Sequence, residues 1–213
     1  MSKKEGQFAE LERAVGVREG FVEGMVDEDD WSFVIKLHAL FEAACGHLLL
    51  FHFREPALAD IVARLELSNK TTGKIAFLAA LRLVGKRSRR YIAALSELRN
   101  DLVHDVRNAE FRLGDWFASL DPAKQRTLAV SFSPFETFLR EGPHLPGVPL
   151  EPKHQEQARL DTVLRRAREQ TKNHIWIGAH YVLVDILDMK GYSEYRQWAK
   201  AEALMSEDGD DAG

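Results

Sequence analysis

An almost continuous apolar segment, residues 31–53, constrains the fold of this chain more than any other feature. Its apolar side chains recur at helical intervals around nearly the whole circumference, which predicts a helix without a wide polar face. A helix of that kind is normally the buried one in a bundle. The acidic cluster Asp27–Asp30 comes directly before it, where N-terminal caps and the helix dipole favour negative charge. We therefore expect a long central helix that other helices surround.

Polar residues inside this segment bear on whether it crosses a membrane. The segment contains too many polar residues for a bilayer span of about 20 apolar residues. The set consists of Lys36, His38, Glu42, His47 and His52. Residues 1–14 are too polar for a signal peptide, whose apolar core runs for roughly 7–15 residues. The sequence predicts a soluble, cytoplasmic protein with no membrane partner.

Helical periodicity continues along the rest of the chain, and no run of alternating apolar and polar residues signals a sheet. We predict helices over 6–26, 31–53, 56–65, 75–85 and 86–104, two short helices between 111 and 140, and a long helical stretch over 153–190. Asp121-Pro122 and Ser133-Pro134 are expected to break the two short helices. The predicted fold class is all-α, an up-and-down bundle of four to five core helices with additional C-terminal helices.

The length of 213 residues and an apolar content of 45% predict one domain with elaborated ends. We divide it into a helical bundle over 1–140, a Pro- and Gly-rich connector over 141–152 and a C-terminal helical extension over 153–205 that packs on the bundle. The acidic tail 206–213 is predicted to be disordered. The extension either completes the bundle or docks a second subunit, and the sequence does not separate these options.

The formal charge of −4 does not indicate a general nucleic-acid or membrane binder, so any basic surface has to be local. Cys45 is the single cysteine, which excludes a disulfide framework and a thiolate zinc cage within one chain. His38 and Glu42 are spaced to face one metal ion on a helix. The paired Glu-x-x-His repeats of a di-iron bundle are absent, however, and buried, hydrogen-bonded histidines are the simpler interpretation. We predict no cofactor and no metal.

The segment SELRNDLVHD, residues 96–105, places polar side chains at the end of a predicted helix. The apolar positions of that helix recur every three or four residues and predict a core stripe of Tyr91, Leu95, Leu98 and Leu102. Asn100 and His104 are four residues apart, so they share a face that points away from the stripe, and Arg99 flanks it. This polar face is either solvated or covered by something else.

A second polar residue of interest is Glu42, in the middle of the apolar segment. A carboxylate on so apolar a helix is costly unless it is hydrogen-bonded or paired with a cation. Arg99 is the expected partner, because its planar guanidinium makes bidentate bonds to carboxylates. That pair would hold the arginine in one position.

The segment LSELRNDLVHD, together with the acidic FEAA of residues 41–44, resembles the HEPN superfamily. The resemblance covers about residues 30–110 and implies an all-α domain built around four or five helices. Many members are metal-independent endoribonucleases of toxin–antitoxin and phage-defence systems. It further implies that Arg99 and His104 are the motif pair, that Asn100 is the polar residue favoured after the arginine, and that Glu42 is the supporting acid.

The chemistry of RNA cleavage without a metal suits these residue types. The ribose 2′-OH is the nucleophile, so the site needs proton transfer and stabilisation of charge on the phosphorane oxygens. Histidine titrates near neutrality, and arginine donates paired hydrogen bonds to phosphate. One trio supplies a single histidine, and the resemblance implies a homodimer in which two motifs line one cleft. RNA and an antitoxin or regulatory protein are then the expected partners.

A local excess of positive charge surrounds the motif. Seven Lys or Arg residues lie between Arg82 and Arg107 against three acidic residues, an excess of four, and the run KRSRR of residues 86–90 supplies most of it. Local patches of this kind drive phosphate binding. The alternative interpretation is a solvated helix start.

Non-catalytic alternatives apply to the motif as well. Cationic side chains are stabilising at any helix C-terminus, so Arg99 and His104 could have only that role. Several HEPN-like families are regulatory or assembly modules, with the mannitol operon repressor group as an example. The alternative function is therefore a helical regulatory or interaction domain.

Overall fold

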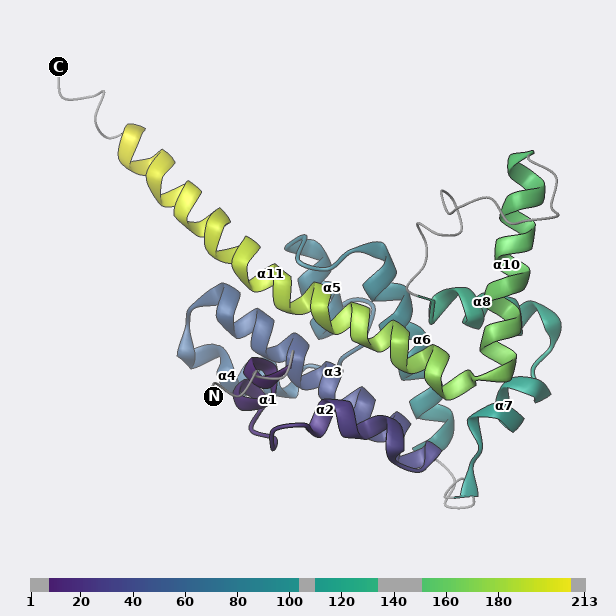
Figure 1. Ribbon diagram of the computed structural model, residues 1–213. Helices are drawn as coiled ribbons and strands as arrows, with labels where there is room; N and C mark the ends of the chain where they lie inside the picture. Colours follow the sequence, from purple (N-terminus) through teal and green to yellow (C-terminus); the bar gives the residue numbers. More distant parts are fainter. Residues whose placement is uncertain (1–7, 104–109, 134–150, 208–213) are drawn as a thin grey trace, which may run out of the picture.

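The computed structural model describes residues 8–103, 110–133 and 151–207, and within these ranges it contains no β-strand. The described elements, in chain order, are α1 (Ala9–Val15), α2 (Phe21–Gly24), η1 (Met25–Asp27), α3 (Asp30–Phe53), η2 (Pro56–Leu58), α4 (Ala59–Arg64), α5 (Lys74–Ala80), α6 (Lys86–Val103), α7 (Leu113–Ser119), α8 (Pro122–Ser131), α10 (Pro152–Glu169) and α11 (Thr171–Glu207). The predicted all-α helical bundle is confirmed (Figure 1).

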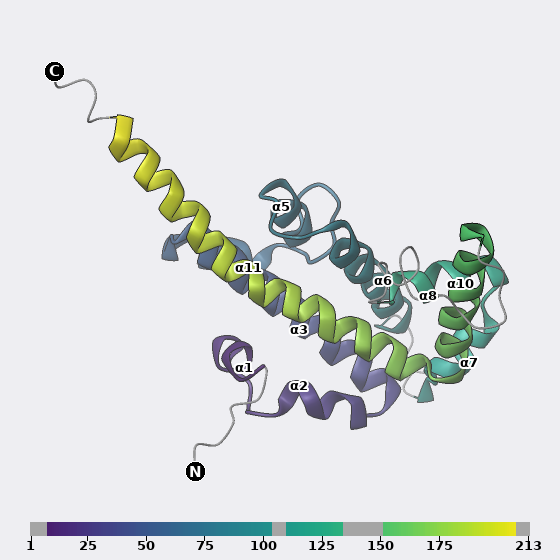
Figure 2. The same ribbon diagram turned by 45° about the horizontal axis from the view of Figure 1, so that its top comes forward.

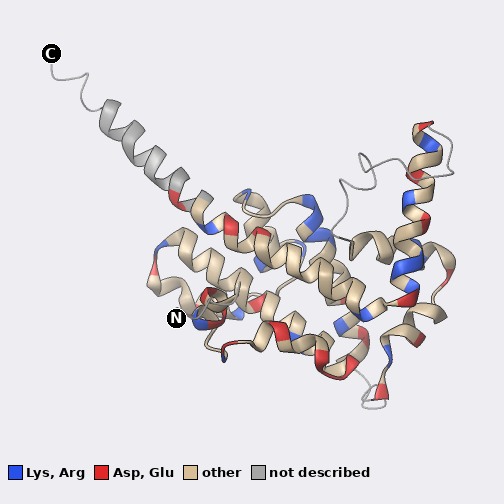
Figure 3. Ribbon diagram, in the orientation of Figure 1, with Lys and Arg blue, Asp and Glu red and all other residues tan. Residues whose placement is uncertain are grey.

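Helix α3 lies at the centre of the bundle, as its apolar sequence predicts. The Asp29 carboxylate accepts a hydrogen bond from the Ser32 backbone N–H at 2.9 Å, so the acidic cluster does provide the N-terminal cap. The helix ends at Arg54, whose φ of 53° is left-handed. Most of its apolar side chains are fully buried, and its ribbon is largely free of charged residues (Figure 3).

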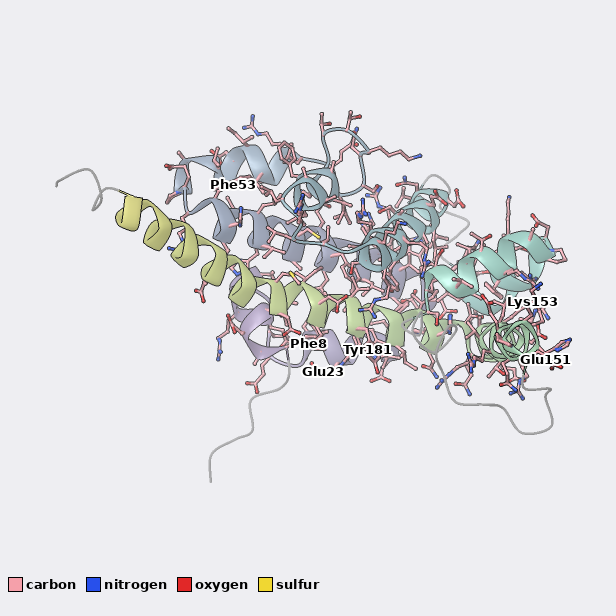
Figure 4. All side chains as sticks on the ribbon, turned by 90° about the horizontal axis from the view of Figure 1, so that it is seen from above. Phe8, Glu23, Phe53, Glu151, Lys153 and Tyr181 are labelled. Atoms are coloured by element: carbon pink, nitrogen blue, oxygen red, sulfur yellow. The ribbon has the colours of Figure 1, made fainter. Side chains whose placement is uncertain are left out.

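Helix α11 runs alongside α3 and α6 and completes the main core (Figures 1 and 2). Its side chains in the main apolar core are Ile175, Ala179, Val182, Leu183 and Ile186. Viewed from above, side chains fill the space between α3 and α11, with Phe53 near one end of the molecule and Lys153 at the other (Figure 4). This part of α11 therefore belongs to the bundle, and docking of a second subunit stays a prediction.

Helix α6 presents the predicted core stripe to α3 and α11. Tyr91, Leu95, Leu98 and Leu102 are each at most 2% exposed. The Tyr91 hydroxyl donates a hydrogen bond to the Ile175 carbonyl at 2.9 Å, which satisfies the one polar group of the stripe. The helical periodicity of this segment thus identified its buried face correctly.

The predicted single helix over 6–26 is wrong. Gly16 and Gly20 have positive φ values of 76° and 77°, so the chain leaves the helix at the first and enters α2 after the second. The buried Glu12 carboxylate accepts hydrogen bonds from the backbone N–H groups of Gly20 at 3.0 Å and Val22 at 2.8 Å. These bonds hold the intervening loop against α1.

The predicted helical stretch over 153–190 is present, and it consists of two helices because the chain turns at Gln170. Helix α10 ends there and α11 begins at Thr171, whose hydroxyl donates back to the Ala167 carbonyl at 2.8 Å. Helix α10 packs on α7 and α8 around a second small core of Phe117, Ala129, Val163 and Ala167. Most of the predicted connector and of the acidic tail, 141–150 and 208–213, lies outside the described residues.

One described helix, α3, is long and apolar enough to cross a membrane by length and composition. Of its most apolar window, 61% is buried inside the protein. A core helix of a soluble protein meets the same criterion, so the absence of a membrane partner and the cytoplasmic location stay predictions.

Candidate functional site

The last turns of α6 carry Arg99, which flanks the core stripe, and Asn100, which is on the side away from it. Asn100 is exposed and Arg99 is half-buried. The guanidinium of Arg99 donates from Nη1 to Asn100 Oδ1 at 3.1 Å. Within the described ranges no carboxylate lies within ion-pair distance of this arginine. His104 follows α6 but lies outside the described residues, so the geometry of the Arg99 and His104 pair stays a prediction.

Glu42 is paired with Lys74 and not with the expected Arg99. Lys74 Nζ lies 3.1 Å from Glu42 Oε1, and the lysine side chain is 3% exposed against 40% for the glutamate. The same ammonium donates to the Leu65 carbonyl and to the Ala63 carbonyl, the latter at 3.5 Å. These carbonyls lie at the C-terminal end of α4, where helices leave acceptors unpaired. Lys74 therefore neutralises Glu42 and caps α4 at once.

The sequence contains only a weak signal for Lys74. It is the first residue of α5 and follows the turn SNKTTG, in which the Asn69 side chain accepts hydrogen bonds from Thr71 N–H at 3.0 Å and Thr72 N–H at 3.1 Å. A lysine at a helix start is ordinarily solvated. Its burial follows from how this turn lays α5 against α3.

His38 belongs to α3, and its side chain is directed toward α6 and is nine-tenths buried. Its Nε2 is 3.2 Å from Ser96 Oγ, so the ring is hydrogen-bonded inside the bundle. Burial lowers its pKa below the ordinary 6.5, the nearby positive charges of Arg99 and Lys74 lower it further, and the negative charge of Glu42 opposes them. We call these five residues, His38, Glu42, Lys74, Ser96 and Arg99, the polar cluster.

The basic run of residues 86–90 is partly structural. Arg87 Nη2 lies 2.5 Å from Asp185 Oδ2 of α11, and the Ser88 hydroxyl donates to the same oxygen at 3.1 Å. Arg90 donates to the Val130 carbonyl of α8 at 3.3 Å. Lys86 and Arg89 are the exposed cations of the run. The run therefore contributes less free positive charge than its sequence implies.

A cavity of about 380 Å³ lies beside the polar cluster, between α1, α3, α4 and α5. Small residues form much of its wall, among them Ala39, Ala43 and Gly46. Glu42, Lys74 and His47 are its polar lining. His47 Nε2 is buried, with no hydrogen-bond partner among the described residues. Burial lowers the pKa of His47, the charge of Lys190 lowers it further, and Glu10 opposes them.

Neither a metal centre nor a reactive thiol is apparent in the described part of the chain. No group of three or more His, Cys, Asp or Glu side chains there is arranged to hold a metal ion. Complete burial raises the pKa of the Cys45 thiol to about 12, so the thiolate is not formed near neutrality. Among the described residues, the polar groups available at this site are Arg99, Asn100 and the polar lining of the cavity.

Comparison of the chain with family models, with curated proteins and with solved structures finds no match in any of the three. The resemblance to the HEPN superfamily therefore rests on the motif residues alone. What the geometry offers chemically is the half-buried guanidinium of Arg99, which has no acidic partner among the described residues. Such a group binds phosphate or another anion.

Proposed function

We propose that the chain is a HEPN-like, metal-independent endoribonuclease that binds the RNA backbone at Arg99 and Asn100. The observation that supports this most is the contact of Arg99 with the neutral Asn100 instead of a carboxylate. Because Glu42 is neutralised by Lys74, the charge of Arg99 is not cancelled by that acid. An arginine with no acidic partner among the described residues is suited to bidentate binding of a phosphate.

In the proposed reaction the ribose 2′-oxygen attacks the adjacent phosphorus, and the bond from phosphorus to the 5′-oxygen breaks. The products are a 2′,3′-cyclic phosphate and a free 5′-hydroxyl. One proton leaves the 2′-OH and one is delivered to the 5′-oxygen, and His104 is proposed for one of these transfers. Arg99 stabilises the negative charge that develops on the phosphorane oxygens.

The second proton transfer is assigned in this proposal to His104 of a second copy, which makes the active form a homodimer. His38 is a poor candidate for this role because it is buried and hydrogen-bonded to Ser96. Sedimentation of the intact protein tests this part. A dimer is expected, and a monomer that cleaves RNA at all concentrations would contradict it.

The activity is tested with the purified full chain and a mixed RNA pool in the presence of EDTA. Cleavage is expected in the wild type, and Arg99→Ala or His104→Ala is expected to lower its rate by roughly 100-fold or more. Arg126→Ala is the matched control, because Arg126 is an exposed cation on α8 outside the polar cluster. Circular dichroism and urea unfolding establish that each variant is folded.

Equal cleavage by wild type and both motif variants would contradict the proposal, as would a folded wild type that neither binds nor cleaves any RNA. In the second case a protein that co-purifies with the chain would support the alternative, a non-catalytic HEPN-like regulatory domain. An antitoxin is the partner expected if the chain is a toxin.

A further inference from the structure

We infer that the cavity between α1, α3, α4 and α5 is a base-binding site that selects guanine. The inference rests on the proposed function in taking the base to be part of an RNA. The cavity shares Glu42 with the predicted site, but Arg99 and Asn100 do not line it.

The size and walls of the cavity fit a flat, largely neutral ligand. Its volume of about 380 Å³ lies in the range of small-molecule sites. Ala39 and Ala43 are exposed along one side, and Ala59 and Ala63 of α4 lie along another. Short side chains on both sides leave a space that a planar ring can enter.

Apart from the imidazole of His47, whose Nε2 has no hydrogen-bond partner among the described residues, the polar lining of the cavity offers acceptors more than donors. Lys74 has three ammonium protons and three acceptors, which are Glu42 Oε1 and the carbonyls of Ala63 and Leu65. It therefore has no donor left for a ligand. The Glu42 carboxylate can accept about four hydrogen bonds, and Lys74 takes one of them. A ligand with hydrogen-bond donors is thus expected to bind there.

The local charge argues against a fixed cation as the ligand. Glu42 and Lys74 neutralise one another, and burial lowers the pKa of His47, which disfavours its charged form. A neutral group that presents two adjacent donors is the better match for a carboxylate. Among the RNA bases, guanine presents such an edge, with a ring N–H beside an exocyclic amino group. The Watson–Crick edges of the other three bases carry at least as many acceptors as donors.

The cavity and the proposed phosphate site lie near one another. His38, one turn before Glu42 on α3, lies 3.2 Å from the hydroxyl of Ser96, which is one turn before Arg99 on α6, so the cavity and Arg99 adjoin the same contact between α3 and α6. Bases in single-stranded RNA can leave the stack and enter protein pockets, where their edges are hydrogen-bonded. A guanine in the cavity would select where the backbone is held at Arg99.

The test compares guanosine with inosine, which differ only in the exocyclic amino group. Equilibrium dialysis or ligand-observed NMR with the intact protein measures both affinities, and neither nucleoside carries a phosphate, so Arg99 is not required. Guanosine is expected to bind about 10-fold more tightly than inosine. Equal affinities, or no guanosine binding by the folded protein, would overturn the inference.

Two variants locate the binding. Ala43→Leu fills the exposed side of the cavity and is expected to weaken guanosine binding at least 10-fold, whereas Ala93→Leu, on an exposed position of α6, is the matched control with unchanged affinity. Gly46→Ala adds a methyl group to the cavity wall and is also expected to weaken guanosine binding. The added Cβ would lie 3.5 Å from Lys74 Cε, which is an ordinary contact, so the protein should fold. Unchanged binding in both cavity variants would contradict the assignment.

Arg99→Ala separates the two hypotheses. We expect this variant to lose RNA cleavage and to keep guanosine binding. A wild type that binds guanosine selectively but cleaves no RNA would refute the proposed function and support the base site. Cleavage of RNA by a wild type that does not bind guanosine selectively would support the proposed function and refute the base site.

Discussion

Lys74 Nζ and Glu42 Oε1 lie 3.1 Å apart, and the lysine is almost completely buried while the glutamate is not. The pair joins α5 to α3, and the same ammonium binds two carbonyls at the end of α4. Three helices therefore depend on one lysine. Both residues also line the cavity. Because Glu42 is paired with Lys74, it is not the ion-pair partner that we expected for Arg99.

Replacement of this lysine is expected to destabilise the fold. Lys74→Met keeps most of the apolar stem but removes the charge, and it leaves the carbonyls of Ala63 and Leu65 without this donor. We expect a loss of about 1–3 kcal/mol in the free energy of unfolding, measured by urea denaturation. Lys70→Met is the control, because Lys70 is exposed in the preceding turn. Equal stability of the two variants would show that the buried ammonium does not contribute to the free energy of unfolding.

Gly178 allows α11 to approach α6 and the end of α8. A Cβ at this position would lie 2.0 Å from the Phe132 carbonyl oxygen and 2.8 Å from Tyr91 Cε2, so the backbone would have to move. Gly178→Ala should cost about 1–3 kcal/mol through overpacking, measured as a lower Tm. Gly191→Ala on the same helix meets nothing within 4 Å and should be neutral or stabilising. A neutral Gly178→Ala would contradict the close approach.

Buried histidines should make the fold sensitive to mild acid. Burial lowers the pKa of His38 and of His174, although the bond of His174 Nε2 to the Ala129 carbonyl at 2.8 Å partly opposes the shift in His174. The unfolded chain binds protons near the ordinary pKa of 6.5 while the folded chain resists them, so stability present above pH 6.5 is lost as the pH falls toward the folded values. The urea midpoint should therefore be lower at pH 5 than at pH 7.5.

The His174 contribution is isolated by a variant that does not titrate. His174→Gln keeps a donor for the Ala129 carbonyl, and its midpoint should fall less between pH 7.5 and 5 than that of the wild type. An identical pH dependence in the two proteins would exclude His174 as a source of the effect.

The Cys45 thiol should be unreactive in the folded protein. It is completely buried and its pKa is raised to about 12, so little thiolate is present at pH 8. A thiol reagent such as DTNB should modify it at least 100-fold more slowly in buffer than in denaturing urea. Rapid modification of the native protein would show that α3 is accessible at this position.

Local sequence signals were sufficient for several features of the fold. The apolar periodicity of residues 31–53 and the cap at Asp29 identified α3, because both depend on residues within a few positions of one another. The stripe of Tyr91, Leu95, Leu98 and Leu102 identified the buried face of α6 for the same reason. The breaks at Gly16, Gly20 and Gln170 were missed, because helical patterns on either side of a turn look continuous.

The sequence by itself determined the all-α class, the central helix and the outward placement of Asn100 at the end of α6. Only the tertiary structure decided the partner of Glu42. Lys74 is 32 residues away along the chain, and no periodicity relates the two positions. Their contact exists because the turn of residues 68–73 lays α5 against α3. In that position the buried ammonium of Lys74 contacts the Glu42 carboxylate and the carbonyls at the end of α4. Partners across helices follow from packing, which residue patterns within one helix do not contain.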